Sequence, residues 1–193
     1  MQFLYAFDFD GTLTTRDTLL EFIRYARGNA RFTWGFLLHS PILILMLLHL
    51  YPNWKAKQHI FAYFFKGMKE SDFDRYCQEF AAKNRHLLRV QGIEAVENAL
   101  QEGSDVAIVS ASINRWVQPF FPHTRVIGTE IEVENGLLTG RFLTPNCYGK
   151  EKVARLRKVF PDLARRHVIA FGDSQGDREL LQVAAEAHYK PFR

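Results

Sequence analysis

The sequence predicts an α/β fold: a doubly wound, mainly parallel sheet with a helical domain inserted after the first strand. From residue 89 onward, short apolar runs alternate with amphipathic helical segments, which is typical of a sheet with helices on both faces. Residues 17 to about 88 show helical spacing without strand alternation. We therefore expect a core of residues 1–15 and 89–193, and an all-helical cap of residues 16–88.

The first strand is the aromatic and aliphatic run QFLYAF, which is short and bounded by Asp and Gly. The cap begins with TLLEFIRYAR, whose apolar residues recur at helical spacing after Asp17, a typical N-cap residue. After the cap, IEAVENALQEG predicts an amphipathic helix that ends at Gly103. The run VAIVS follows and has the composition of a strand buried on both faces.

The second half of the chain continues the alternation. NRWVQPFF predicts a helix, and RVIGTEI and GLLTGRF predict strands joined by a turn at Asn135-Gly136. A helix is expected from Lys150 to Phe160, then the strand HVIAFGD, the helix GDRELLQVAAE and a last strand in AHYKPF. Ligands of such sheets bind at the carboxyl ends of the strands, and three of these strands end in polar residues.

The composition indicates a globular chain with a substantial core. Net charge is +4, from 25 Lys and Arg against 21 Asp and Glu, and the basic residues are spread along the chain. This balance suits an enzyme that handles anions, and it disfavours nucleic acid as a partner. Cys77 and Cys147 lie far apart without CxxC spacing, so neither a disulfide framework nor a zinc site is expected. This cysteine usage fits a reducing compartment, so we expect a cytoplasmic location. We expect no signal peptide, because acidic residues arrive at position 8 without a preceding basic region.

One segment of the cap is long, apolar and uncharged. It runs from Phe32 to Trp54, FTWGFLLHSPILILMLLHLYPNW, and is flanked by basic residues on both sides. A single membrane span here would separate Asp8 from the polar strand ends that follow it, so we expect instead two short helices broken at Ser40-Pro41. Burial within the cap or in a dimer interface is the preferred interpretation, and a position at the inner membrane surface is the alternative.

Two carboxylates end the first strand. Asp8 and Asp10 are two residues apart on an extended chain, so both face one side before Gly11. Two carboxylates at such a short distance repel each other, and each disfavours the ionisation of the other. A divalent cation bound between them would relieve this repulsion. The pair suits phosphoryl transfer, with one Asp as nucleophile and the other as proton donor. A strand that simply closes with a turn is the alternative interpretation.

Three further motifs follow at later strand and helix ends. Ser110 ends VAIVS and, with the Ala111 amide, could hold a phosphate oxygen, since Ser112 is the better helix cap. CYGKEKVARL places two lysines at a helix start, where an anionic partner would offset their position on the helix dipole. HVIAFGDSQGDREL places Asp173 and Asp177 around a strand end, a geometry suited to Mg²⁺, although Asp177 could instead cap the helix.

The chain resembles the haloacid dehalogenase-like (HAD) superfamily of phosphatases. The resemblance rests on four motifs in a fixed order: DxDGT at a strand end, Ser at a strand end, Lys at a helix start, and GDxxxD at a strand end. The helical insertion after the first motif is most similar to the phosphoserine phosphatase-like branch, subfamily IB. The resemblance covers essentially the whole chain. It implies a Rossmann-like core and a Mg²⁺-dependent phosphomonoester hydrolase that acts through an aspartyl-phosphate.

The resemblance also implies a role for each motif residue. Asp8 would be the nucleophile, and Asp10 the general acid and base, with its backbone carbonyl on the metal. Asp173 would bind Mg²⁺ with Asp8 and Asp10, and Asp177 would support that site. The phosphoryl group would be held by the hydroxyl of Ser110, by the amides of Gly11 and Ala111, and by Lys152, with Lys150 as the alternative lysine. Asp17 stands where relatives carry a substrate-recognition residue.

The chain also departs from phosphoserine phosphatases. The insertion lacks a recognisable Arg-containing segment for the substrate carboxylate, and Gly176 stands where an Asn is common. We expect a small phosphorylated metabolite as substrate. One alternative is an amphiphilic or lipid phosphate, because some relatives with an apolar cap segment act on phosphatidylglycerophosphate. The other is a phosphate-responsive or membrane-docking module without turnover.

Overall fold

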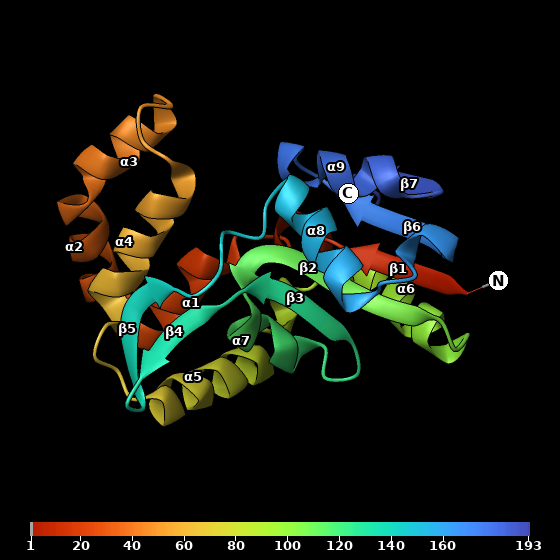
Figure 1. Ribbon diagram of the computed structural model, residues 1–193. Coiled ribbons are helices and arrows are strands. Elements are labelled where there is room, and N and C mark those ends of the chain that lie inside the picture. Colours follow the sequence, from red (N-terminus) through yellow and green to blue (C-terminus); the bar gives the residue numbers. More distant parts are fainter. Residues whose placement is uncertain (1) are drawn as a thin grey trace.

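The computed structural model describes residues 2–193 and contains the predicted α/β core with a helical cap (Figure 1). Five parallel strands form the central sheet in the order β3-β2-β1-β6-β7. Their bounds are β1 Phe3–Phe7, β2 Asp105–Ile113, β3 Arg125–Thr129, β6 His167–Gly172 and β7 Glu186–Tyr189. The predicted fold class is therefore confirmed.

Alternate residues of β1 point into two different cores, as a sheet covered on both faces requires. Phe7 belongs to a large cluster that includes Val96 of α6 (Val90–Gln101) and Trp116 of α7 (Asn114–Val117). Leu4 and Ala6 belong to a second cluster with residues of α8 (Lys150–Val159) and α9 (Arg178–Val183). The sheet is thus doubly wound, with α6 and α7 on one face and α8 and α9 on the other.

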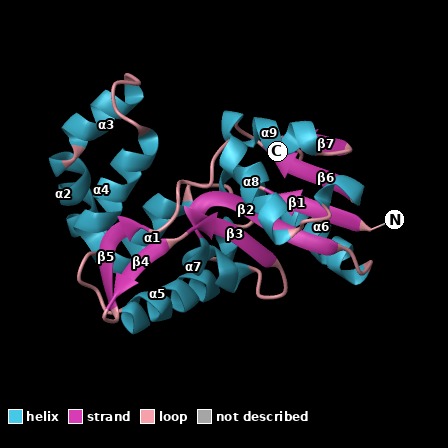
Figure 2. Cartoon of the chain, in the orientation of Figure 1, coloured by secondary structure: helices cyan, strands magenta, loops and turns pink. Residues whose placement is uncertain are grey.

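The cap consists of five helices that gather at the carboxyl end of the sheet (Figure 2). They are α1 Thr18–Arg27, α2 Asn29–Leu38, α3 Ser40–Leu47, α4 Asn53–Phe65 and α5 Glu70–Lys83. Asp17 caps α1 as predicted, since its carboxylate accepts the amide N–H groups of Leu19 and Leu20. Aromatic side chains from α1, α4, α5 and α7 fill the space between cap and core, among them Phe22, Phe73 and Trp116.

The two chain segments that join core and cap run side by side. The Thr15 amide donates to Leu87 O, and the Arg89 amide donates to Leu13 O, each at 2.8 Å. A β-hairpin from the second half of the chain, β4 Ile131–Glu134 and β5 Leu137–Phe142, turns at Asn135-Gly136 as predicted. It packs on α4, where the Phe142 amide donates to Gln58 Oε1 at 2.9 Å. The hairpin therefore lies against the cap, although its residues fall within the range 89–193 that was predicted for the core. The domain boundaries themselves stay a prediction.

The long apolar segment forms the expected pair of short helices, α2 and α3, with the break at His39. Burial of this segment within the cap, one of the two forms of the preferred interpretation, is wrong: α3 contains no buried residue, and Leu47 and Leu48 are 72% and 61% exposed. The reason is geometric, because α2 and α3 form, together with α4, an arm of the cap that extends away from the sheet, and nothing in the described part of the chain covers their outer side (Figure 1). Burial in a dimer interface stays a prediction. Within residues 2–193, no helix alone has the length and hydropathy to cross a bilayer; α2 and α3 meet that test only jointly and are bent by 62°.

Candidate active site

The polar strand ends meet in one cavity of about 370 Å³ between the sheet and the cap. Asp8, Asp10, Ser110 and Lys152 line its inner end. They come from the loop after β1, from β2 and from α8, so the fold brings together motifs more than a hundred residues apart. The parallel order of β1, β2 and β6 places these strand ends at the same edge of the sheet.

Asp8 is buried and paired with a lysine at the bottom of the cavity. Its side chain is only 8% exposed, and Oδ1 accepts a hydrogen bond from Lys152 Nζ at 2.5 Å. Burial raises the pKa of Asp8 to about 7, and the nearby Asp177 and Asp10 carboxylates raise it too, whereas the Lys152 ammonium opposes them. Burial lowers the pKa of Lys152, but Asp8 and Asp177 outweigh it and raise that pKa above its usual value.

Lys152 also bridges to Asp177, whose Oδ1 lies 2.6 Å from Nζ. The second oxygen of Asp177 accepts the amide N–H of Asp173 at 3.1 Å and the amide and hydroxyl of Ser174 at 3.0 and 2.7 Å. Burial opposes ionisation of Asp177, yet Lys152 and Ser174 hold its pKa below the usual value. The alternative lysine, Lys150, is exposed, so it is Lys152 that the structure places at Asp8.

Asp10 is held by hydroxyl groups. Its Oδ1 accepts the amide and the hydroxyl of Thr18 at 2.8 and 2.6 Å, and Oδ2 accepts the hydroxyl of Ser112. Thr18 in turn accepts Trp116 Nε1–H at 3.2 Å. Ser112 was expected to cap a helix, and that expectation is wrong: it lies within β2, and α7 begins only after Ile113. Its hydroxyl points toward Asp10 instead, in the part of β2 where the pairing with β3 shifts register.

Gly11 and Ala111, whose backbone amides were expected to hold the phosphate, have different surroundings. Gly11 has φ of 86°, and a Cβ there would lie 2.6 Å from Asp173 Oδ2, so both the turn and the close approach require glycine. Its N–H donates to Thr14 Oγ1 at 3.2 Å, so in this conformation that amide is not free for a phosphate. Ala111 lines the cavity beside Ser110, and its carbonyl accepts Lys57 Nζ at 2.9 Å.

An acidic cluster suited to a divalent cation lies beside Asp8. One oxygen from each of Asp8, Asp173 and Asp177 lies within 4.8 Å of the others, and hard carboxylate oxygens are the ligands that Mg²⁺ prefers. Asp177 also contacts Lys152 and Ser174, whereas Asp173 accepts the hydroxyl of Thr12 at 3.4 Å and pairs with the guanidinium of Arg193. The carboxylate oxygens of this cluster are therefore of the kind that could hold Mg²⁺.

One charged residue of the cavity, Lys57, had no signal in the sequence. Lys57 comes from α4 and lines the cavity close to Asp10 and Asp17; burial lowers its pKa, and these carboxylates oppose that shift. Asp17, the expected recognition residue, lines the same cavity. The glycine of the last motif also has a structural reason, because a Cβ on Gly176 would lie 2.4 Å from the Tyr148 ring.

The fold and this site define a doubly wound, Rossmann-like α/β core with a helical cap inserted after its first strand and an acidic cluster at its strand ends. The family model for haloacid dehalogenase-like hydrolases matches residues 5–182. The chain therefore belongs to the haloacid dehalogenase-like hydrolase family.

Individual relatives agree with this assignment. The chain is 35% identical over 196 residues to Protein CicA of Caulobacter vibrioides, covering 98% of this chain and 86% of the relative. A protein with unknown function from Bordetella pertussis Tohama I has a TM-score of 0.82 at 20% identity, covering 94% and 86% of the two chains. A phosphoserine phosphatase solved as an analogue of its phospho-aspartyl intermediate has a TM-score of 0.59 at 18% identity, covering 95% and 83%. The structural neighbours thus include phosphoserine phosphatases.

Proposed function

We propose that this chain is a Mg²⁺-dependent phosphomonoester hydrolase that acts through an aspartyl-phosphate on Asp8. The observation that carries the proposal is the Asp8–Lys152 pair at the inner end of the cavity, with Asp10 beside it. The phosphoserine phosphatase solved as a phospho-aspartyl intermediate analogue supports the same chemistry for this fold.

In this mechanism an oxygen of Asp8 attacks phosphorus, and the bond from phosphorus to the alcohol oxygen breaks. Asp10 donates a proton to the departing oxygen, and Lys152 and Ser110 hold the phosphoryl oxygens. Asp10 then takes a proton from water, whose oxygen attacks phosphorus and releases inorganic phosphate and the Asp8 carboxylate. Mg²⁺, held by Asp8, Asp173 and the Asp10 carbonyl, would neutralise charge on the phosphoryl group.

The test is Mg²⁺-dependent release of phosphate from an aryl phosphate and from a broad panel of phosphorylated metabolites. We expect activity in the wild type, none in Asp8→Asn, and wild-type activity in Glu94→Gln, an exposed acid-to-amide control on α6. Equal inactivity of wild type and Asp8→Asn across the panel would contradict the proposal. Stable accumulation of aspartyl-phosphate without hydrolysis would instead support a phosphate-responsive module.

A second candidate substrate class is favoured by the outer wall of the cavity. Beyond the polar end, the cavity is lined by apolar side chains of the cap, including Leu20 of α1, Phe36 of α2, and Leu43 and Met46 of α3. An amphiphilic phosphomonoester would place its phosphate at Asp8 and its alkyl part along this wall. The comparison of kcat/KM for alkyl phosphates of increasing chain length tests this candidate. A kcat/KM that rises with chain length in the wild type but not in Leu43→Ser supports this candidate. A kcat/KM that does not depend on chain length favours a small polar metabolite instead.

The location of the chain also remains a proposal. We propose a cytoplasmic protein that is peripheral at the inner membrane face, and cell fractionation at low and high salt tests it. Recovery in the membrane fraction at low salt and release at high salt is the expected result.

A further inference from the structure

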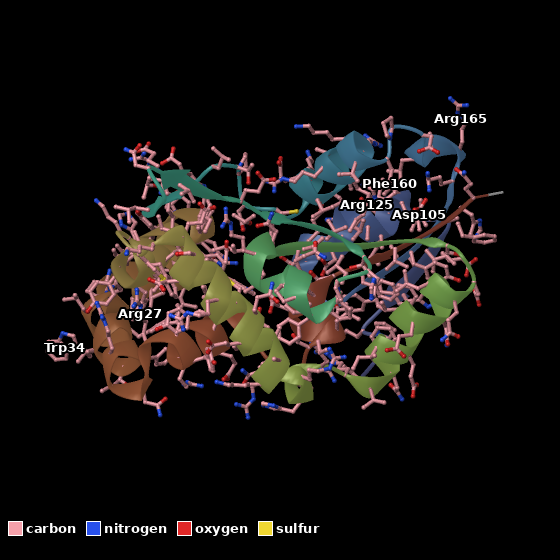
Figure 3. All side chains as sticks on the ribbon, turned by 90° about the horizontal axis from the view of Figure 1, so that it is seen from below. Arg27, Trp34, Asp105, Arg125, Phe160 and Arg165 are labelled. Atoms are coloured by element: carbon pink, nitrogen blue, oxygen red, sulfur yellow. The ribbon has the colours of Figure 1, made fainter. Side chains whose placement is uncertain are left out.

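The end of the helical arm carries a concentrated apolar surface, here called the apolar tip and defined as residues 34–54. Among residues 2–193, 18 large apolar side chains are exposed, and nine of them lie within these 21 residues. Leu47 and Leu50 are each 72% exposed, and Trp34 is 64% exposed. Figure 3 shows Trp34 at the outer edge of the arm, pointing away from the rest of the chain. Contiguous apolar surface of this kind marks an interaction site.

The charge around the apolar tip has one sign. From residue 22 to residue 69 the sequence contains seven Lys or Arg residues and no Asp or Glu. Arg31 and Lys55, which flank the tip in the sequence, are exposed. A two-fold contact between two copies of the tip would bring these like charges together, which disfavours a second copy as the occupant. An anionic surface with an apolar interior matches both the charge and the leucines.

The residues at the border of the tip are those that suit a membrane interface. Trp34 and Trp54 are exposed, and Lys55 Nζ lies 5.5 Å from the centroid of the Trp54 ring. Tryptophan rings rest at the level of lipid headgroups, and lysine side chains extend from there to water or to phosphate. The bend of 62° divides the apolar run into two short helices, α2 and α3, neither of which is long enough to cross a bilayer alone, which fits insertion of the tip into one leaflet.

The opposite side of the same two helices faces the active site. Phe36 of α2 and Leu43 and Met46 of α3 line the cavity that has Asp8 at its inner end. A bilayer on the outer side of α2 and α3 would therefore lie next to the apolar wall of the cavity. The apolar tip and the apolar wall of the cavity are thus two sides of the same helix pair, α2 and α3.

From these observations we propose that the apolar tip docks the protein on an anionic lipid bilayer, with the exposed leucines in the acyl region and the flanking basic residues at the headgroups. This proposal does not depend on catalysis. It assigns the otherwise unexplained exposed surface of α2 and α3 to a lipid partner.

Flotation with vesicles tests the proposal. The full chain is mixed with vesicles of phosphatidylcholine alone, or of phosphatidylcholine with phosphatidylglycerol. We expect flotation with the anionic vesicles, weaker binding as salt is raised, and a blue shift of tryptophan emission from Trp34 and Trp54. The third tryptophan, Trp116, is fully buried and should not respond.

Matched variants separate insertion from general hydrophobicity. Leu47→Glu with Leu48→Glu should weaken partitioning by about tenfold or more for each leucine. Val90→Glu and Leu143→Glu replace side chains that are 69% and 61% exposed elsewhere on the surface, and both should bind like the wild type. Lys55→Gln should weaken binding to anionic vesicles by about fivefold. Circular dichroism verifies that each variant is folded.

Two results would overturn the proposal. One is that the wild type fails to float with anionic vesicles at low salt. The other is that the wild type sediments as a dimer which Leu47→Glu with Leu48→Glu dissociates, while vesicle binding is unchanged. Asp8→Asn should bind vesicles like the wild type, so a failure of the phosphatase proposal and a failure of lipid docking are observed in separate experiments.

Discussion

Lys152 is the group whose removal should disturb this protein most, because it is 2% exposed and neutralises two buried carboxylates. The change is Lys152→Met, which keeps most of the side-chain volume and removes the charge. Loss of one partner from a buried ion pair costs about 3–5 kcal/mol. Asp8 can relieve part of this cost by taking up a proton, since its pKa is already raised to about 7. We therefore expect a loss near the lower limit, about 3 kcal/mol.

The pH dependence gives the sign of the effect. Lys152 holds the pKa of Asp177 below its usual value, so this contribution to stability is present above the unfolded-state pKa of Asp, about 3.9, and is lost as pH falls further. The pKa of Lys152 itself is raised, so its contribution is complete below the unfolded-state pKa of about 10.4 and is lost as pH rises through the folded-state value. The difference between wild type and variant should shrink below about pH 4. It should grow above about pH 7, where Asp8 ionises in the wild type but the variant lacks the ammonium that favours this ionisation.

Urea denaturation followed by circular dichroism, with a chelator present to exclude metal binding, measures this difference in the free energy of unfolding. In a thermal denaturation of a chain of this size, 3 kcal/mol corresponds to a fall in Tm of roughly 6–12 °C. Lys150→Met is the matched control, because Lys150 lies two residues earlier and is exposed; it should change stability by less than about 0.5 kcal/mol. Equal stability of Lys152→Met and wild type at pH 7 would refute the pairing of Lys152 with Asp8 and Asp177.

Three further predictions concern the metal and the proton donor. Mg²⁺ affinity, measured by calorimetry, should fall about tenfold from pH 8 to pH 6, because protons compete with the metal for Asp8 at a pKa of about 7; a pH-independent affinity would contradict this. Arg193→Ala should raise Mg²⁺ affinity about two- to fivefold, since the guanidinium pairs with Asp173; unchanged affinity would show that this pair does not compete. Thr18→Val should lower kcat about tenfold with little change in KM, because the hydroxyl that orients Asp10 is lost; Thr33→Val, an exposed change on α2, is its control.

The sequence was sufficient for features that depend on local pattern and on strand ends. Alternation of apolar runs and helices predicted the sheet, and the carboxyl ends of β1, β2 and β6 predicted where Asp8, Ser110 and Asp173 would meet. Parallel strands fix that meeting point whatever the connecting segments do. The N-cap at Asp17 was also predictable, because it depends only on the residue and the helix that follows it.

Features that depend on tertiary contact were not predictable in this way. The burial of α2 and α3 was expected from their composition, but composition does not say whether a neighbouring element covers a helix. The length of β2 and its register shift against β3 are likewise tertiary features, and Ser112, expected as a helix cap, lies within this strand and bonds to Asp10. Lys57 approaches the site from α4 through the packing of the cap, which no spacing in the sequence encodes.

The two carboxylates of the first motif are chemically alike but have different surroundings, and this difference supports their separate roles. Asp8 faces an ammonium, and Lys152 can only donate hydrogen bonds, so this contact favours the carboxylate form that acts as a nucleophile and opposes the effect of burial, which raises the pKa of Asp8 to about 7. Asp10 faces the hydroxyls of Thr18 and Ser112, and a hydroxyl can donate to a carboxylate or accept from a carboxylic acid. Only the second environment can hold a carboxyl group in place in both protonation states. A residue that gives a proton to the leaving group and then takes one from water needs that property, and of the two aspartates Asp10 has it.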